Sequence, residues 1–215
     1  MISIPILAPV LPASNSPANR QRLSLTIGSM AHGRTLIQPS STALVVVDLQ
    51  ERLMPGIAGR EGVVENTVKL LRLARLLDLA TLATTQYRKG LGDTIPPIAE
   101  LLSAEPLDKI SFGCMNDASF CALLAKQLPS RNTLLLAGVE THICVLQTAL
   151  GALEAGYNVH VVSDATGSRS TANAQLGLQR MRDAGAVVSS TEMAIYELLG
   201  DSRRAEFKQM LPYLK

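Results

Sequence analysis

The sequence has 215 residues, a formal net charge of +2 and 47% apolar residues. This length and composition suit one domain whose sheet is covered on both faces, and a second full domain is not expected. Aromatic residues make up only 3% of the chain and Trp is absent, so stacking platforms for bases or sugars are not evident. Three basic residues lie in the acid-free first 47 positions, which leaves the remainder close to neutral. We therefore expect no nucleic-acid partner.

Residues 1–40 are rich in Pro, Ser and Ala and lack a regular apolar period, which predicts a flexible extension ahead of one domain at residues 41–215. The apolar stretch at residues 2–11 is interrupted by two prolines and is too short to span a bilayer, so we expect no membrane segment. The expected location is cytoplasmic. Because the extension contains Arg and Ser but no acid, organelle targeting is an alternative, and Met30 is an alternative start.

The cysteines and histidines do not occur at the spacings of a disulfide framework or a metal site. The three cysteines form no Cys-x-x-Cys pair, which favours a reducing compartment; they are Cys114, Cys121 and Cys144. The three histidines lack His-Glu-x-x-His and Asp-x-His spacing; they are His32, His142 and His160. We therefore expect neither a metal nor a cofactor.

Beyond residue 40, short apolar runs alternate with longer amphipathic segments, a pattern typical of a parallel sheet covered by helices. The fold class expected is α/β, a three-layer αβα sandwich with a mostly parallel, doubly wound, Rossmann-like sheet. Strands are predicted at residues 43–47, 81–85, 133–137, 158–162 and 186–189. Helices are predicted at residues 62–79, after Asn116, at 141–155 with Gly156 as the C-cap, and at 170–184, 191–199 and 203–211.

Cys144 is expected at the N-terminus of the helix at residues 141–155. It follows an apolar run and a glycine, in the sequence Leu-Leu-Leu-Ala-Gly-Val-Glu-Thr-His-Ile-Cys. Free backbone amides and the positive end of the helix dipole favour thiolate over thiol at such a position. The alternative is that Cys144 is a small, buried apolar residue. Partners elsewhere in the chain decide between the two interpretations.

Two charged residues could act with this thiol, because ligands of open parallel sheets gather beyond the carboxyl ends of the strands. Asp48 directly follows five apolar residues, so its carboxylate is expected to be partly desolvated and suited to proton transfer. The alternative is that Asp48 caps a turn or a short helix. Lys109 precedes a brief apolar stretch and, on its own, is typical of a surface residue. Beside Asp48 and Cys144, its ammonium would stabilise the charged forms of both.

Other polar residues near the strand ends have structural interpretations. Asp164 is expected to accept backbone amides in a turn, with Ser168 or Ser170 capping the next helix. His142 lies two residues before Cys144, a spacing at which helical side chains do not face each other. We therefore expect His142 to line the mouth of a pocket rather than to form a Cys–His dyad.

Three motifs, in this order, closely resemble those of the isochorismatase-like cysteine hydrolase family, which includes nicotinamidases and N-carbamoylsarcosine amidohydrolase. They are Asp48 in Val-Val-Val-Asp-Leu-Gln, Lys109 in Asp-Lys-Ile-Ser-Phe, and Cys144 in Gly-Val-Glu-Thr-His-Ile-Cys-Val. The resemblance covers roughly residues 36–190, and the motif around Cys144 is its most specific part. Residues 84–93 look like the branch of small isochorismatase-domain proteins rather than the nicotinamidases.

The resemblance implies an Asp-Lys-Cys triad and a covalent mechanism. Asp48 would take the thiol proton, Cys144 would attack a carbonyl carbon, and Lys109 would stabilise the charged pair. Water would then hydrolyse the resulting thioester. Where nicotinamidases carry an Asp-x-His metal-binding stretch, this chain reads Gln-Tyr-Arg-Lys at residues 86–89, so no metal is implied.

The same resemblance implies a cis peptide bond between Val139 and Glu140. The backbone N–H groups of Glu140 and Cys144 would then form the oxyanion hole.

The expected function is therefore cleavage of a C–N bond in a small amide, ureido or carbamoyl compound. The alternatives are a catalytically silent binding or assembly protein of the same fold and a thiol-redox protein that uses a second cysteine. Since relatives commonly assemble and the mean hydropathy is positive, we also expect a homo-oligomer. Closeness to the motifs suggests five substrate contacts, which are Gln50, Gln86, Tyr87, Phe112 and His142.

Overall fold

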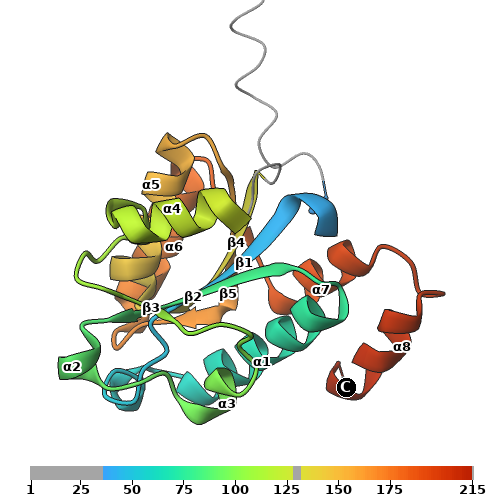
Figure 1. Ribbon diagram of the computed structural model, residues 1–215, viewed down its shortest axis with the longest axis horizontal. Helices are drawn as coiled ribbons and strands as arrows, with labels where there is room; N and C mark the ends of the chain where they lie inside the picture. The colour runs from blue at the N-terminus through green and yellow to red at the C-terminus, as the bar shows by residue number, and fades with distance from the viewer. Residues whose placement is uncertain (1–35, 128–131, 215) are drawn as a thin grey trace, which may run out of the picture. The chain divides into compact units, whose positions relative to one another are not determined.

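The computed structural model describes residues 36–127 and 132–214. These residues form a six-stranded parallel sheet in the order β3-β2-β1-β4-β5-β6 (Figure 1). The strands are β1 (Thr42–Val47), β2 (Ala80–Gln86), β3 (Leu107–Lys109), β4 (Thr133–Val139), β5 (Asn158–Gly167) and β6 (Val187–Ser189). Helices cover both faces, so the predicted three-layer αβα sandwich with a doubly wound, Rossmann-like sheet is confirmed.

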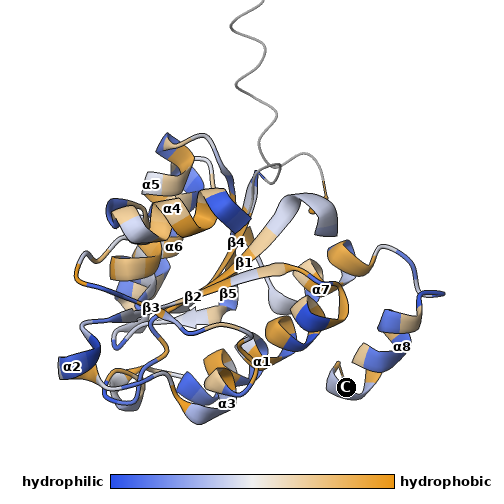
Figure 2. Ribbon diagram, viewed as in Figure 1, coloured by the Kyte–Doolittle hydropathy of each residue, from blue (hydrophilic) through white to orange (hydrophobic). Residues whose placement is uncertain are grey.

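Each face of the sheet packs against its own set of helices, because successive side chains of a strand point to opposite faces. Leu44 and Val46 of β1 belong to one apolar core, and Val45 and Val47 belong to the other. The first core is covered by α1 (Arg60–Leu76), α3 (Pro96–Ala99), α7 (Thr191–Leu199) and α8 (Ala205–Met210). The second is covered by α4 (Ala118–Gln127), α5 (Leu146–Glu154) and α6 (Thr171–Asp183). Figure 2 shows the apolar strands lying between these two layers.

The predicted elements agree with the structure where the sequence has a clear apolar period. All five predicted strands are present, and the helix predicted at residues 191–199 is α7 with the same bounds. Strand β3 was not predicted, because its three residues include Asp108 and Lys109 and form no apolar run. Helix α2 (Arg88–Leu91) and helix α3 were also missed, since each is a single turn without a measurable period.

The order of the strands reverses between β1 and β4, which are neighbours in space but not in sequence. Gly138 of β4 pairs with Val47 of β1 and has a φ of +119°. A Cβ atom on Gly138 would lie 2.0 Å from the carbonyl oxygen of Val47, so only glycine fits there. Ligands of open α/β sheets bind beside such a reversal point, at the carboxyl ends of its strands.

Polar side chains accept hydrogen bonds from the first residues of the helices α6 and α7. The Ser170 hydroxyl accepts a hydrogen bond from the Asn173 amide and caps α6, which confirms one of the two predicted caps. Asp164 Oδ1 accepts hydrogen bonds from the amide and hydroxyl of Thr191 at 2.7 and 2.9 Å. The role of Asp164 is therefore structural, as expected, although the amide that it accepts belongs to α7 rather than to its own turn.

Most of the extension predicted at residues 1–40 lies outside the described residues. Within the described part, Pro39–Ser41 forms a single 3-10 turn that leads directly into β1. Among the residues that the structure describes, no helix is both long and apolar enough to cross a membrane.

Candidate active site

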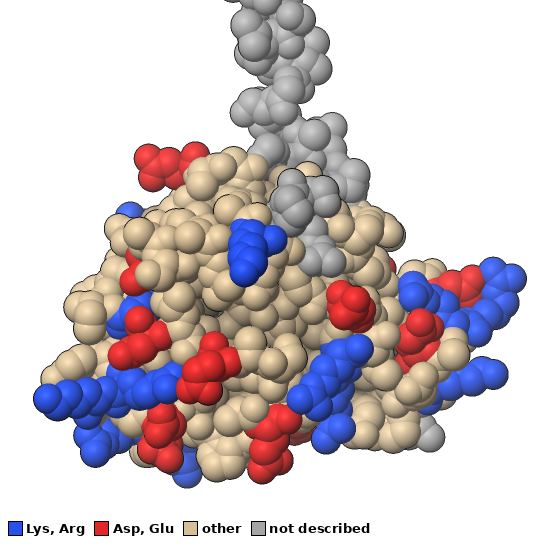
Figure 3. All heavy atoms as spheres, in the orientation of Figure 1, with Lys and Arg blue, Asp and Glu red and all other residues tan. Residues whose placement is uncertain are grey.

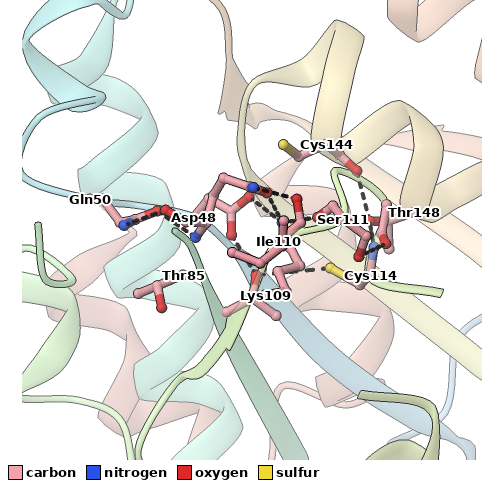
Figure 4. A network of polar contacts seen from close by, with 12 residues as sticks. Asp48, Gln50, Thr85, Lys109, Ile110, Ser111, Cys114, Cys144 and Thr148 are labelled. Carbon is pink, nitrogen blue, oxygen red and sulfur yellow. Dashed lines mark hydrogen bonds and ion pairs between the residues drawn. The ribbon is translucent and has the colours of Figure 1, made fainter. Parts of the chain in front are cut away.

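Three of the residues selected from the sequence lie together at the carboxyl edge of the sheet. Asp48 directly follows β1, Lys109 is the last residue of β3, and Cys144 follows β4 (Figure 4). Asp48 and Cys144 flank the reversal point between β1 and β4. Lys109 comes from the edge strand, and its long side chain extends past β2 to reach Asp48. The fold thus joins groups that are far apart in the sequence.

Asp48 and Lys109 form a buried ion pair. The distance from Lys109 Nζ to Asp48 Oδ2 is 2.7 Å, and both side chains are 0% exposed. The other carboxylate oxygen, Oδ1, accepts a 2.7 Å hydrogen bond from the Thr84 hydroxyl. Asp48 has a φ of 53°, a left-handed conformation that non-glycine residues rarely adopt. The carboxylate is therefore fixed by two donors at the point where the chain leaves the sheet.

The ammonium of Lys109 has an acceptor for each of its three N–H bonds. Besides Asp48, Nζ donates to Gln86 Oε1 at 2.9 Å and to the Ser111 carbonyl at 3.2 Å. A buried ammonium is tolerated only when it is paired and hydrogen-bonded in this way. The sequence alone was typical of a surface lysine, and the structure places this lysine among the largest fully buried side chains instead.

Gln50 binds both backbone polar groups of Gln86. Its Oε1 accepts from the Gln86 amide at 2.7 Å, and its Nε2 donates to the Gln86 carbonyl at 3.1 Å and to the Gly92 carbonyl at 2.8 Å. The side chain of Gln50 is fully buried. Gln50 therefore fastens the end of β2 and the loop after α2 to the segment that follows Asp48.

Cys144 lies in a widened, π-helical turn, Thr141–Val145, that precedes α5. The Val145 amide donates to the Glu140 carbonyl at 3.2 Å, the wider spacing that defines this kind of turn. The sequence predicted one uninterrupted α-helix from residue 141, and that prediction is wrong for its first turn. The peptide bond between Val139 and Glu140 is cis, as the resemblance implied.

Thr148 ties the turn that carries Cys144 to a second cysteine. Its hydroxyl donates to the Cys144 carbonyl at 2.7 Å and accepts from the Cys114 amide at 2.9 Å. Cys114 is completely buried, and its sulfur lies 3.9 Å from the hydroxyl of Thr84. Burial raises the pKa of Cys114 to about 11, although the charge of Lys109 acts in the opposite direction.

The electrostatics of Cys144 differ from the sequence-based expectation. Its pKa is raised to about 12, first by burial and then by the negative charge of Asp48, while the charge of Lys109 lowers it. The side chain of Asp48, as an acceptor for the thiol proton, also raises this pKa. The helix N-terminus was expected to favour a thiolate, and here burial and the neighbouring carboxylate outweigh that effect. The resting group is a thiol beside an acceptor for its proton.

A cavity of about 380 Å³ opens onto Cys144. Apolar side chains form much of its wall, together with one cationic and a few polar groups. The lining residues are Leu53, Gln86, Leu91, Phe112, Glu140, Ile143, Cys144, Gln147 and Arg169. A cavity of this size suits a small molecule.

The structure places the five expected substrate contacts differently. Gln86 and Phe112 line the cavity, whereas Gln50, Tyr87 and His142 are not among its lining residues. Gln50 is committed to the backbone of Gln86, as described above. His142 Nδ1 lies 2.9 Å from the Ser168 hydroxyl, which directs the imidazole toward the loop after β5.

Several lining residues were not selected from the sequence. Leu53, Leu91 and Ile143 look like core residues, because an apolar side chain at a loop or helix edge carries no local mark of a cavity. Arg169 lies just after the end of the long strand β5. A charged residue at that place was the one sequence signal that could have marked Arg169 as a cavity residue. The Arg169 amide donates to Glu140 Oε2 at 2.9 Å, and its Nε lies 3.5 Å from Glu140 Oε1.

Within the residues described, no group of three or more His, Cys, Asp or Glu side chains is arranged to hold a metal ion. Gln86, which stands where the nicotinamidase motif begins its metal-binding stretch, uses both ends of its amide. Oε1 accepts from Lys109, and Nε2 donates to the Ile110 carbonyl at 2.7 Å.

The six-stranded parallel sheet with helices on both faces is the arrangement of an isochorismatase-like hydrolase fold. Residues 42–193 match the family described as "Isochorismatase domain", and the chain belongs to this family. It is 38% identical over 181 residues to the "Secreted isochorismatase effector Isc1" of Phytophthora sojae, covering 82% of this chain and 86% of that protein.

Two solved structures share the fold over most of their length. The MAR1 ribonuclease from Caenorhabditis elegans superposes with a TM-score of 0.78 at 35% identity, covering 84% of this chain and 92% of that one. The YcaC gene product of Escherichia coli, described as an octameric hydrolase of unknown specificity, has a TM-score of 0.78 at 25% identity, covering 83% of this chain and 90% of that one.

Proposed function

We propose that this protein is a cysteine hydrolase that cleaves a C–N bond in a small amide, ureido or carbamoyl compound. One observation carries the proposal: the thiol of Cys144 forms part of a cavity wall beside a buried Asp48–Lys109 pair. A nucleophile, an adjacent proton acceptor and a fixed cation are the groups that acyl transfer through a covalent intermediate requires. The catalytic unit proposed is the domain at residues 41–215.

In the first step, the sulfur of Cys144 attacks the carbonyl carbon of the substrate while its proton moves to Asp48. Because the pKa of the thiol is about 12, free thiolate is scarce at neutral pH, and removal of the proton during the attack avoids the need for it. The C=O bond becomes a C–O⁻ bond in the tetrahedral intermediate. The backbone N–H groups of Glu140 and Cys144 are the donors proposed for this oxyanion.

In the second step, the intermediate collapses, the C–N bond breaks, and the leaving nitrogen takes the proton from Asp48. An acyl group remains on Cys144 as a thioester. Asp48 then removes a proton from water, whose oxygen attacks the thioester carbon. The C–S bond breaks, the acid leaves, and the proton passes from Asp48 to the sulfur, which restores the thiol of Cys144 and the carboxylate of Asp48. Lys109 balances the charge of the carboxylate in each state in which Asp48 is ionised.

The chemistry of the cavity favours a small amide over a polyanion. The similar structure from Caenorhabditis elegans is called a ribonuclease, and an RNA substrate would need an extended cationic surface. On the face shown in Figure 3, Lys and Arg side chains are interspersed with Asp and Glu. Lys109, whose charge acts on Cys144, is buried and has an acceptor for each N–H bond, and Arg169 at the cavity is paired with Glu140. These features support a compact substrate.

A panel of small amides, ureido acids and carbamoyl compounds tests the proposal, with release of ammonia or amine as the measurement. Wild type should hydrolyse at least one member, and Cys144→Ala should lose this activity completely. Intact-mass analysis of a rapidly quenched reaction should detect the acyl group on Cys144. The matched control is Cys121→Ala, which removes a thiol outside the cavity. Equal activity of wild type and Cys144→Ala would overturn the proposal, and inactivity of both across the panel would favour a silent binding or assembly protein.

We further propose that the chain works as a cytoplasmic homo-oligomer. Ile110 and Phe112 are 70% and 55% exposed beside the edge strand β3, and burial against another copy would remove this apolar surface from water. The octameric YcaC structure supports assembly. Three free cysteines support a reducing location. Light scattering and imaging of the tagged full chain test the two statements.

A further inference from the structure

The ammonium of Lys109 is held by more than its ion pair. Asp48 occupies one of its three N–H bonds and the Ser111 carbonyl occupies another, as Figure 4 shows. The third goes to Gln86 Oε1 at 2.9 Å, closer than the 3.2 Å to Ser111. With all three donors engaged, Lys109 has none free to bind a substrate.

Gln86 is itself fixed from several sides. Its Nε2 donates to the Ile110 carbonyl at 2.7 Å, which orients the amide so that Oε1 faces Lys109. Its backbone amide and carbonyl are both bound by Gln50, two residues after Asp48. The hydrogen bonds therefore form a closed ring that runs from the segment after Asp48 through Gln86 and Lys109 and back to Asp48. A side chain held in this way has a defined position before any substrate arrives.

The side-chain amide of Gln86 is neutral, which suits its position beside the charged pair. The charge of Lys109 lowers the pKa of Cys144, whereas that of Asp48 raises it. A neutral acceptor on Lys109 adds no third charge, so the acid–lysine pair remains balanced beside the thiol. Gln86 is 8% exposed and lies in the cavity wall, where an amide can orient the ammonium without shielding it by a second carboxylate.

We propose that Gln86 is a positioning residue, whose neutral side-chain carbonyl holds the ammonium of Lys109 in place, so that Lys109 acts on Cys144 as a fixed cation and does not bind substrate. This inference rests on the proposed function and deepens it, because it assigns Gln86 to the acid–lysine pair rather than to substrate recognition. It predicts that the thiol senses the loss of Gln86 only through Lys109.

The test follows alkylation of Cys144 in the full chain by iodoacetamide at pH 9, with peptide mapping to separate the three cysteines. Gln86→Met keeps the length of the side chain but removes the acceptor, and it should slow alkylation of Cys144 by about tenfold, the effect of one pKa unit. Gln179→Met is the matched control, since Gln179 is exposed on α6 and is not among the residues that line the cavity, and the alkylation rate of Cys144 in this variant should stay within about twofold of wild type.

A double-mutant cycle decides whether Gln86 acts through Lys109. Lys109→Met should slow alkylation, and Gln86→Met should add nothing further in that background. If the two substitutions slow alkylation independently, so that their effects multiply, the inference is overturned. A wild-type rate in either single variant, or equal slowing by Gln86→Met and Gln179→Met, would also overturn it. If circular dichroism shows that Gln86→Met does not fold, Gln86→Glu replaces it. This variant keeps an acceptor but adds a negative charge, so it should also slow alkylation, and a wild-type rate would again overturn the inference.

The outcome is separable from that of the proposed function. If Gln86 and Lys109 are coupled but wild type hydrolyses no amide, this inference stands and the hydrolase proposal is wrong. If wild type hydrolyses an amide through Cys144 but the alkylation rates show no coupling between Gln86 and Lys109, the hydrolase proposal stands and this inference is wrong.

Discussion

Lys109 Nζ lies 2.7 Å from Asp48 Oδ2, and neither side chain is exposed to solvent. Removal of one partner from such a pair leaves an uncompensated charge in the protein interior, which costs far more than an exposed pair contributes. The same contact places the ammonium beside the carboxylate that is proposed to take the thiol proton. Stability and the proposed activity would therefore depend on the same ion pair.

Asp48→Asn should reduce both properties. The free energy of unfolding should fall by about 3–5 kcal/mol, because Lys109 loses its counter-charge. Hydrolysis should fall by about a hundredfold or more, because the amide cannot accept the proton of Cys144. Urea unfolding and amide hydrolysis are the measurements. The control is Asp164→Asn, which weakens the contact with Thr191 on α7 and should keep hydrolysis near wild type. Full activity in Asp48→Asn would contradict the assignment of the base.

The pKa of Cys144, about 12, predicts an unusual pH dependence for its direct alkylation. Because the thiolate fraction grows about tenfold per pH unit below the pKa, the iodoacetamide rate should keep rising from pH 7 to pH 10 without a plateau. The urea-unfolded chain, with ordinary thiols, should begin to level off near pH 9. Peptide mapping at each pH gives both curves. A plateau for folded Cys144 below pH 9 would show that the helix N-terminus dominates after all.

The two raised thiol pKa values also predict how stability changes at alkaline pH. Unfolded cysteines release their protons near pH 9, whereas Cys114 and Cys144 retain theirs in the folded state until about pH 11 and about pH 12. Above pH 9 the unfolded chain therefore binds fewer protons than the folded one, so the free energy of unfolding falls as the pH rises toward 12. The stabilising contribution is complete below pH 9. Urea unfolding between pH 8 and pH 10.5 should show this decline.

The double variant Cys114→Ala and Cys144→Ala is the comparison for that series. Its stability at pH 8 should be lower because side-chain volume is lost from the core, but its decline with pH should be less steep. Parallel declines in the two proteins would mean that other groups are responsible.

The sequence was sufficient for five of the six strands of the sheet and for the ends of the two strands that precede Asp48 and Cys144. Asp48 and Cys144 follow long apolar runs, and in a parallel sheet the ends of such runs meet at one edge, so their closeness could be inferred. Lys109 could not be placed in this way, because β3 has no apolar run and its pairing with β2 is a tertiary event. The order of motifs shared with the family identified it instead.

The contacts around these residues depend on how strands and helices pair in the fold, and the local sequence pattern does not reveal them. Gln86 meets Lys109 because the two are partners across β2 and β3. Thr148 meets Cys114 because α5 packs beside the turn Cys114–Asn116, at a distance in sequence that no short motif spans. The direction of the pKa shift of Cys144 was also predicted wrongly, because it depends on how deeply the fold buries the thiol beside Asp48.

Thr148→Val should loosen the turn that carries Cys144. The substitution preserves shape but removes the donor to the Cys144 carbonyl and the acceptor for the Cys114 amide, so the free energy of unfolding should fall by about 1–3 kcal/mol. Amide hydrolysis should fall as well, because the nucleophile is less well placed. Thr67→Val is the control: it removes one buried hydroxyl that bonds only within α1, to the Val63 carbonyl. Hydrolysis should survive that change, and equal losses in both variants would argue against a specific role for Thr148.

Gly138→Ala should be the most damaging small substitution in the sheet. Gly138 has a φ of +119°, and an added Cβ would lie 2.0 Å from the Val47 carbonyl oxygen and 2.6 Å from the Val47 amide nitrogen, both of which are backbone atoms that cannot move aside cheaply. Separation of β1 from β4 would displace Asp48 from Cys144 at the reversal point. We expect loss of folded protein or of more than about 3 kcal/mol of stability, together with loss of hydrolysis. Gly156→Ala separates backbone strain from crowding, since Gly156 also has a positive φ, +87°, but an added Cβ there would meet nothing within 4 Å. That variant should lose only about 1 kcal/mol and remain active. If thermal unfolding shows the two variants to be equally stable, the close approach of β1 and β4 is not what requires glycine at position 138.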